Sequence, residues 1–361
     1  GSGEILRVES HPTPGARSFE VDRDTGAITD ESYTTIPTSY VIQTVGQVKG
    51  KIALTFDDGP DPEWTPAILD ILKAKHVRAT FFVIGENAEA NPGLITRLLA
   101  EGHELGNHTF THPNLADTPG EGVKLELNAT QRLVEALTGR SMRLFRPPYL
   151  GDAEPASGDE ITPVEIAQNL GYVTVGEHAD TEDWQLPPPA TMIKTVMTEI
   201  TNPNPEFRGN IVLLHDSGGD RSRTVEVLAP LIDRLQAEGY KLVPVSELAG
   251  LSRDQAMPPL SPTIALMTDR FVFLTLSYLG QAFYYMFMVA IGLGIARLFV
   301  LGVLAFWNKH QVSSVVPPSP DPSTLPVSVL PPAYNEEVVI GTTVGRGLAS
   351  GYARLERSVI D

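Results

Sequence analysis

The chain has 361 residues, of which 42% are hydrophobic, so it can form one large domain with additional parts or two ordinary domains. Its formal net charge of -17 argues against a nucleic-acid binder, because no basic excess is present to neutralise phosphates. The absence of cysteine excludes disulfides and thiolate ligands, so histidine and carboxylate groups must hold any metal. The chain begins with Gly1-Ser2-Gly3, without an initiator methionine or a signal peptide, and we expect it to be an excerpt of a longer protein.

Residues 1–47 are polar, rich in threonine and serine, and carry no long apolar period. We expect them to be a lead-in or the edge of an upstream domain. From residue 48 to residue 250, short apolar runs alternate with segments of helical periodicity. The expected strands are 51–56, 78–84, 142–145, 172–175, 210–214 and 240–243, and the expected helices are 64–75, 94–100, 123–137, 163–170, 191–200 and 225–237. This α/β alternation predicts a mostly parallel sheet, and about seven such units favour a barrel over the doubly wound alternative.

The chain changes character after residue 250. Residues 251–268 form a linker rich in proline and serine, and residues 271–307 carry a single charge, Arg297. Because about 20 apolar residues suffice to cross a bilayer, we expect a transmembrane segment over 269–308, as one long helix or two short ones. The cations Arg297 and Lys309 favour a cytoplasmic C-terminal end.

Two pairs of residues indicate a metal site. Asp57 and Asp58 follow the first apolar run, where a solvated Asp-Gly turn is the simpler interpretation of the pair alone. His108 and His112 are four residues apart, which places them on one face of a helix or a tight turn where both can bind one divalent ion. Together with Asp58 they form a set of two histidines and one aspartate, which is typical of a catalytic metal site with open positions.

Further polar residues follow predicted strands. Arg146 is permanently charged and can keep a neighbouring carboxylate ionised, although a surface salt bridge is the alternative. Asp183 and Trp184 lie beyond the next strand. His215 ends the apolar run 210–214, at a position where α/β barrels carry catalytic groups, although a structural histidine is equally compatible with that position alone. Their joint occurrence at strand ends favours a catalytic site on one rim of a barrel.

The ordered fragments TFDDGP, NHTFTH, RPPY, DTEDW and LLH resemble the five motifs of the polysaccharide deacetylase family, the NodB homology domain of the carbohydrate esterases. The resemblance covers about residues 51–248 and implies a distorted (β/α) barrel that removes acetyl groups from sugars. Two departures bear on groove shape and chain-length preference. The segment after Tyr149 begins with Leu150 where many relatives have glycine, and the approach Gly176-Glu177-His178 is more polar than usual.

The resemblance implies a role for each matched residue. Asp57 would be the general base, oriented by Arg146, and His215 would be the general acid, with Asp183 as its partner. A metal-bound water would be the nucleophile. The remaining matched residues are the metal ligands Asp58, His108 and His112, the oxyanion-hole position Tyr149 with its backbone N–H, and the acetyl-pocket residues Trp184 and Leu213. Zinc is the expected metal, with cobalt, nickel and manganese as alternatives.

The tail adds a second resemblance. Residues 328–337 (SVLPPAYNEE) resemble the first strand and turn of inverting, membrane-bound family-two glycosyltransferases. The segment 309–361 would therefore be a linker followed by the start of a transferase that is too short to be active. These parts predict a bacterial-type membrane protein with an extracytoplasmic deacetylase and a cytoplasmic tail. The expected activity is hydrolysis of N-acetyl groups from an extracellular N-acetylglucosamine-type polysaccharide, and the alternatives are an O-acetyl (xylan-type) esterase and a non-catalytic glycan-binding domain.

Overall fold

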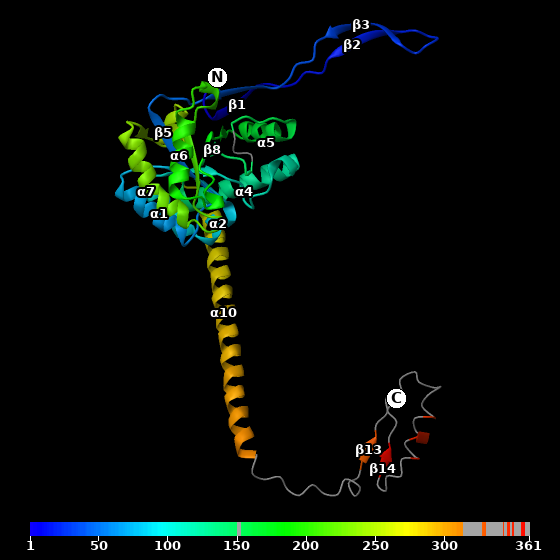
Figure 1. Ribbon diagram of the computed structural model, residues 1–361, viewed down its shortest axis with the longest axis vertical. Helices are drawn as coiled ribbons and strands as arrows, with labels where there is room; N and C mark the ends of the chain where they lie inside the picture. The colour runs from blue at the N-terminus through cyan, green and yellow to red at the C-terminus, as the bar shows by residue number, and fades with distance from the viewer. Residues whose placement is uncertain are drawn as a thin grey trace. The chain divides into compact units, whose positions relative to one another are not determined.

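The computed structural model describes residues 1–149 and 153–312, and beyond them the short pieces 327–329, 342, 345–346, 349 and 355–357. The chain divides into two compact units, Gly1–Phe283 and Tyr284–Asp361. In the first unit, strands and helices alternate along the chain around a central sheet (Figure 1).

The central sheet curves into an open, distorted barrel. Within the described residues it has ten strands, in the order β10-β11-β5-β6-β7-β8-β9-β1-β4, with β12 paired to β5. The strands are β1 (Ile5–Ser10), β4 (Val41–Val45), β5 (Lys51–Asp57), β6 (Thr80–Val83), β7 (Glu104–Asn107), β8 (Leu144–Phe145), β9 (Val173–Val175), β10 (Ala179–Asp180), β11 (Ile211–His215) and β12 (Lys241–Leu242). The strands from β5 to β12 pair in parallel, whereas β1 is antiparallel to both β9 and β4. The expected distorted (β/α) barrel is confirmed.

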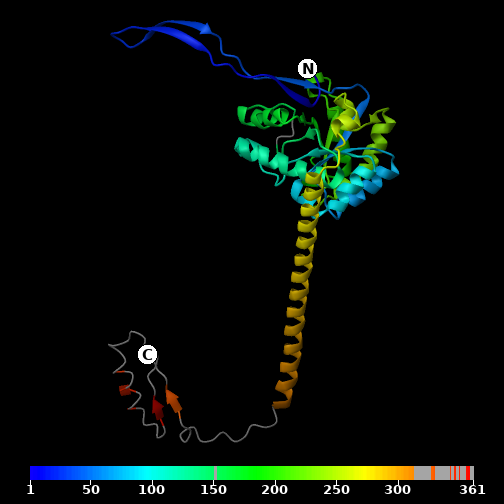
Figure 2. The ribbon, with the colours of Figure 1, turned by 180° about the vertical axis from the view of Figure 1, so that it is seen from behind.

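Helices cover the outside of the sheet. They are α1 (Trp64–Ala74), α2 (Gly85–Ala90), α3 (Pro92–Ala100), α4 (Gly120–Thr138), α5 (Gly158–Asn169), α6 (Pro189–Ile200), α7 (Ser222–Ala237), α8 (Val245–Leu248) and α9 (Arg253–Ala256), with short 3-10 turns at Leu115–Asp117, Asp183–Gln185 and Pro205–Phe207. In both ribbon views, α1, α6 and α7 lie together on one flank of the globular region, and α4 and α5 lie on the opposite flank (Figures 1 and 2). Each of these helices buries apolar residues at helical spacing, as Ile68, Leu69 and Leu72 do in α1.

Strand β5 shows how the sheet positions polar side chains. Successive residues of a strand point to opposite faces. Ile52, Leu54 and Phe56 accordingly belong to the large core under the helices. Thr55 and Asp57 alternate with them and are also buried, so they lie on the inner face of the barrel. Asp57 therefore ends a core strand with its carboxylate inside the molecule.

Residues 1–47 were expected to be only a lead-in or the edge of an upstream domain. In the structure, part of this segment belongs to the barrel. Ile5, Leu6 and Val8 of β1 are buried, and β1 pairs with β9. The carboxylate of Glu4, 1% exposed, accepts backbone hydrogen bonds from Asn210 and Ile211. The strands of this segment were not expected because they contain many polar residues and lie within a polar stretch of the sequence. Between β1 and β4, the hairpin of β2 (Ala16–Val21) and β3 (Ile28–Thr35) is exposed along its whole length.

The apolar tract expected to cross a membrane is one continuous helix, α10 (Ile264–Val312). Among the described residues it is the one helix that is long and apolar enough to span a bilayer, with a mean hydropathy of 2.3 in its apolar window. Farther along, β13 (Val327–Val329) pairs with β14 (Leu355–Arg357). The glycosyltransferase-like segment 328–337 lies outside the described residues, apart from Ser328 and Val329.

Candidate active site

A cavity of about 650 Å³ opens at the carboxyl ends of the parallel strands. This edge of a parallel barrel is where the loops that carry catalytic groups converge. The polar and apolar residues that the motifs singled out line this cavity together, namely Asp57, Asp58, His108, His112, Tyr149, Trp184, Leu213 and His215. Arg146 and Asp183 lie behind its wall, each at most 1% exposed.

Asp58, His108 and His112 form a group that could hold a metal ion, because one ligand atom from each lies within 4.8 Å of the others. The Nε2 atoms of His108 and His112 are 3.5 and 3.2 Å from Oδ1 of Asp58. The histidines come from a tight turn after β7, in which Thr109 and His112 have positive φ angles, and not from a helix. Burial would raise the pKa of Asp58, but the adjacent imidazole groups of His108 and His112 lower it below the ordinary value.

The orientation of His108 fits metal binding. Its Nδ1 lies 2.8 Å from the carbonyl oxygen of Arg146 and must donate to it, so the lone pair is on Nε2, which faces Asp58. Two imidazole nitrogens and one carboxylate oxygen form a donor set that suits zinc and related divalent cations. The described residues therefore fit the expected metal.

A buried ion pair holds Asp57. Nη1 of Arg146 donates to Oδ1 of Asp57 at 2.9 Å and to the hydroxyl of Thr55 at 2.9 Å. The other guanidinium nitrogens donate to the carbonyl oxygens of Val175 and Gly176, and the group lies over the ring of Phe82. All three nitrogens of the guanidinium group therefore donate hydrogen bonds, which fixes its orientation. Because arginine stays charged, the pair places a permanent positive charge beside the carboxylate of Asp57.

His215 is held by a carboxylate of its own. Nδ1 of His215 donates to Oδ1 of Asp183 at 2.6 Å, and the backbone N–H of His215 donates to the other oxygen. Thr224 also donates to that second oxygen. Burial lowers the pKa of His215, but the hydrogen bond and charge of Asp183, with Asp57 and Asp58, raise it to about 9. In the parallel pairing of β11 with β5, His215 lies directly beside Asp57.

The apolar residues of the site differ in exposure. Leu213 is 8% exposed, whereas Trp184 is 58% and Tyr149 is 72% exposed. Tyr149 has a φ of 62°, and its ring packs edge-on against His112 at 4.7 Å between centroids. Leu150, Gly151 and Asp152 follow Tyr149 and lie outside the described residues. Trp184 and Tyr149 therefore form an open rim rather than a closed pocket.

Three charged residues of the cavity wall were not predicted. Glu177, Asp180 and Arg221 line it together with the motif residues. Glu177 belongs to the segment Gly176-Glu177-His178, whose only notable feature in the sequence is its polarity. Arg221, 4% exposed, lies on a turn after β11 and carried no recognisable signal in the sequence.

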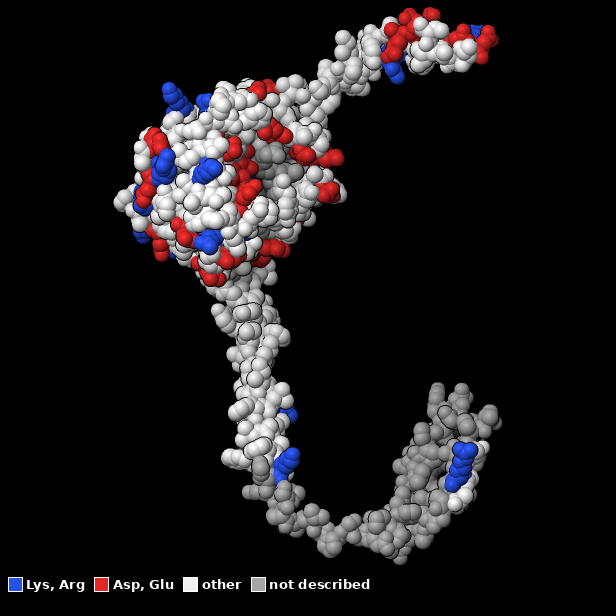
Figure 3. All heavy atoms as spheres, viewed as in Figure 1, with Lys and Arg blue, Asp and Glu red and all other residues white. Residues whose placement is uncertain are grey.

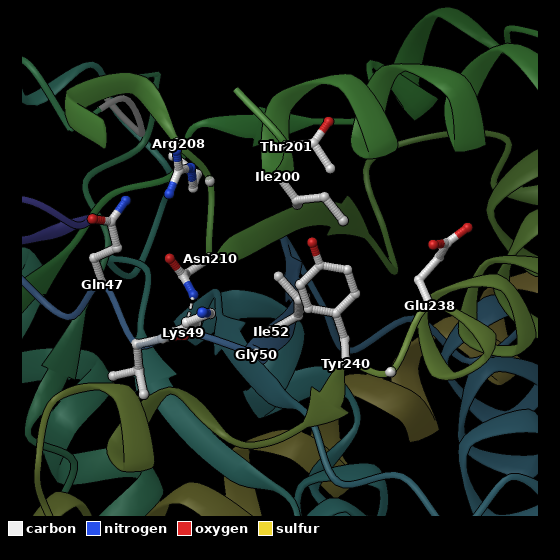
Figure 4. Close-up of a pocket in the computed structure, with 13 residues that line it drawn as sticks. Gln47, Lys49, Gly50, Ile52, Ile200, Thr201, Arg208, Asn210, Glu238 and Tyr240 are labelled. Carbon is white, nitrogen blue, oxygen red and sulfur yellow. Dashed lines mark hydrogen bonds between the residues drawn. The ribbon is translucent and has the colours of Figure 1, made fainter. Parts of the chain in front are cut away.

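A second cavity, of about 580 Å³, lies at the amino ends of β5, β11 and β12 (Figure 4). Its polar side chains hold the backbone of the surrounding loops. Asn210 donates to the carbonyl oxygens of Val48 and Lys51, and Arg208 donates to that of Asn202. Polar groups at this end of a barrel serve stability more often than catalysis, and none of the predicted site residues lines this cavity.

A family model, curated relatives and solved structures all relate the chain to polysaccharide deacetylases. Residues 45–175 match the family model described as polysaccharide deacetylase. The chain is 38% identical over 216 residues to a peptidoglycan-N-acetylglucosamine deacetylase of Bacillus cereus, covering 59% of the chain and 94% of that relative. It is 34% identical over 213 residues to a chitooligosaccharide deacetylase of Azorhizobium caulinodans, covering 56% of the chain and 95% of that relative. Among solved structures, it is similar to a peptidoglycan N-acetylglucosamine deacetylase in complex with 4-naphthalen-1-yl-N-oxidanyl-benzamide, with a TM-score of 0.50, 34% identity and coverage of 57% of the chain and 90% of that structure.

Proposed function

The chain belongs to the polysaccharide deacetylase family, whose members hydrolyse N-acetyl amide bonds, and we propose that it acts with a divalent cation on an N-acetylglucosamine polymer outside the cytoplasm. One observation carries the proposal. The group Asp58, His108 and His112 shares a single cavity with the Asp57–Arg146 pair and the His215–Asp183 pair.

The metal would be bound by Asp58, His108 and His112. We propose zinc, with cobalt, nickel and manganese as alternatives, because the donor set is two imidazole nitrogens and a carboxylate oxygen. When bound, the cation would supply Lewis-acid activation of the acetyl carbonyl and of the attacking water.

Asp57 would act as the general base. Its carboxylate is 3.8 Å from Nε2 of His108, so it lies next to the ligand group, in reach of a water placed there. Arg146 holds Asp57 in place, and a carboxylate can accept the proton of the attacking water. The backbone N–H of Tyr149 would donate a hydrogen bond to the oxyanion that develops on the acetyl oxygen.

His215 would act as the general acid. An amine is a poor leaving group until it is protonated, so breaking the carbon–nitrogen bond requires a proton at the nitrogen. His215 can donate that proton from Nε2, because its Nδ1 is bound to Asp183. Asp183 stabilises the charged imidazolium in the same way. The products are acetate and a free amino group on the sugar.

The relatives indicate the substrate class. Their names specify N-acetylglucosamine in peptidoglycan and chitooligosaccharides, which share a β-linked N-acetylated glucosamine unit. The open rim formed by Tyr149 and Trp184 suits a polymer that passes through the site better than a small, enclosed ligand. We therefore propose N-deacetylation of such a polymer ahead of O-deacetylation of a xylan-type ester.

We also propose that α10 anchors the protein in a membrane. Its apolar side chains between residues 271 and 307 are largely exposed, with Phe271 at 72% and Trp307 at 64%, which a bilayer would cover. In this arrangement the deacetylase unit is extracytoplasmic, and the tail beyond Lys309 is cytoplasmic.

The proposal is tested with the detergent-solubilised protein, zinc and N-acetylglucosamine oligomers. The wild-type protein should release acetate, and chelation of the metal should stop the release. His108→Ala should lower the rate by at least about 100-fold, since it removes a ligand. His11→Ala is the matched control, because His11 is exposed and does not line the cavity. Equal rates in His108→Ala and His11→Ala would refute the metal-dependent mechanism.

A further inference from the structure

Glu177 is a buried carboxyl group that the proposed chemistry does not use. It lines the catalytic cavity and is 9% exposed. Over the part of the chain that the structure describes, its side chain takes part in no hydrogen bond or ion pair. The residue is therefore largely enclosed by protein while its carboxyl oxygens stay open to the cavity, where a bound molecule can supply the missing partner.

The position of Glu177 is fixed without the help of its side chain. The backbone N–H of Gly176 donates to the carbonyl oxygen of Glu4 at 2.7 Å, and the carbonyl oxygen of Gly176 accepts from Arg146. The backbone N–H of His178 donates to the carboxylate of Glu4. The residues on both sides are thus held by Glu4 and by Arg146, which leaves the Glu177 carboxyl group available to a bound molecule.

The charges around Glu177 favour a cation at this wall. Burial raises the pKa of Glu177 to about 8; Arg146 opposes this, and Asp180, Glu4 and Asp57 contribute to it. Arg146 is already paired with Asp57. Asp180, which also lines the cavity, has a pKa raised by burial and by its acidic neighbours. A positively charged group beside these two carboxyls would stabilise their ionised forms.

The basic side chain that lines the cavity, Arg221, comes from a different segment than Glu177 and Asp180. Arg221 reaches the cavity from the turn after β11, near Gly218 and Asp58. Glu177 and Asp180 instead come from the segment around β9 and β10. In the space-filling view, acidic side chains dominate the right-hand half of the globular region, whereas the visible basic ones lie in the left-hand half (Figure 3). A cationic polymer is attracted to such a surface, and an anionic one is repelled.

We propose that Glu177, with Asp180 beside it, binds the ammonium group of a glucosamine unit adjacent to the sugar that is being deacetylated. This inference rests on the proposed function, because the reaction itself produces such amino groups on the polymer. Each turnover then creates the group that the next turnover recognises. The preferred substrate is a partly deacetylated polymer, and the product carries its free amines in clusters.

The test measures binding and turnover of two oligomers of equal length by the zinc-loaded, detergent-solubilised protein. One is fully N-acetylated, and the other carries a glucosamine unit beside an acetylated one. Calorimetry below the pKa of the amine should show about tenfold tighter binding of the glucosamine-containing oligomer. Glu177→Gln should bring the two affinities close together. Glu182→Gln removes the same charge from an exposed residue outside the cavity wall and should preserve the difference.

The ratio of the affinities for the two oligomers distinguishes loss of recognition from structural damage. A misfolded variant would bind both oligomers more weakly to the same extent, whereas loss of an ammonium site weakens binding of the glucosamine-containing oligomer alone. Equal binding of the two oligomers by the wild-type protein, or an unchanged ratio in Glu177→Gln, overturns the inference. Acetate release from the fully acetylated oligomer is measured alongside, and its absence would count against the proposed function without affecting the binding comparison.

Discussion

At the level of single residues, Asp57 and His215 have partners of opposite charge, which suits one to accept a proton and the other to donate one. Asp57 is paired with a buried cation, Arg146, and His215 with a buried anion, Asp183. The two groups are neighbours on β5 and β11, yet one is held as an acceptor and the other as a donor of protons. A carboxylate acceptor beside an imidazole donor is typical of general acid–base catalysis.

Asp57→Asn should abolish most of the activity without unfolding the domain. Asparagine has the same shape and can still accept a hydrogen bond from Arg146, but it cannot take a proton from water. The rate of acetate release should fall by about 100- to 10,000-fold, the usual contribution of a general base. Circular dichroism and metal content should remain those of the wild-type protein. A fall of less than about tenfold would exclude Asp57 as the base.

Asp183→Asn should change the pH dependence of turnover. His215 must be protonated to act as an acid, and its protonated fraction is lost as pH rises through its pKa, which Asp183 helps to raise to about 9. Without the charge of Asp183 the pKa of His215 falls, so the alkaline limb of the kcat profile should move to lower pH. A profile that keeps its alkaline limb in Asp183→Asn would argue against His215 as the acid.

At the scale of elements, the site is built from strand ends and tight turns. The turn at Gly218 brings the segment after β11 against Asp58, since a β-carbon at Gly218 would lie 2.8 Å from Oδ2 of Asp58 and 3.3 Å from Nη2 of Arg221. The φ of Gly218 is +81°, which favours glycine. This contact was not predictable, because the sequence does not reveal which turn approaches the ligand.

Gly218→Ala should therefore weaken metal binding. The added methyl group must displace the Asp58 carboxylate, so zinc affinity measured by competition with a chelator should fall by about 10- to 100-fold. Gly239→Ala is the matched control, because Gly239 has a similar φ of +86° but nothing within 4 Å of the added atom. Similar losses of zinc affinity in both variants would mean that backbone strain, and not the contact with Asp58, is responsible.

The long elements of the fold were predictable from periodicity, and the short ones were not. The strand expected at 51–56 and the helix expected at 64–75 end within one residue of β5 and α1. Strand β7 was missed because Glu104 and Asn107, which look like surface residues, are buried and hydrogen-bonded. Strand β10 has only two residues, which are too few to show the apolar alternation by which a strand is recognised in a sequence. The motif residues were found by resemblance, whereas Glu177 and Arg221 required the three-dimensional arrangement.

At the scale of the whole molecule, the segment before residue 48 is part of the catalytic unit. Glu4 connects β1 to the start of β11 and to the backbone of His178, which lies next to Glu177. The first residues of the chain thus support the wall of the cavity from behind. The exposed hairpin of β2 and β3 has no comparable contacts among the residues described in the first unit.

Glu4→Ala should lower the stability of the deacetylase unit. It leaves the backbone N–H groups of Asn210 and Ile211 buried without their acceptor, which should reduce the free energy of unfolding by roughly 3 kcal/mol. Glu31→Ala makes the same change on the exposed hairpin and should leave the unfolding midpoint nearly unchanged. The measurement is denaturant titration of both variants. Equal unfolding midpoints in Glu4→Ala and Glu31→Ala would contradict a structural role for the Glu4 contacts.

In the proposed mechanism, Asp58, His108 and His112 bind one divalent cation that faces His215. The most direct test is anomalous diffraction at the zinc edge from crystals of the protein grown with zinc. A single strong peak is predicted about 2 Å from Nε2 of both histidines and from a carboxylate oxygen of Asp58. Zinc bound elsewhere, with this group empty at saturating metal, would show that these three residues are not the metal site.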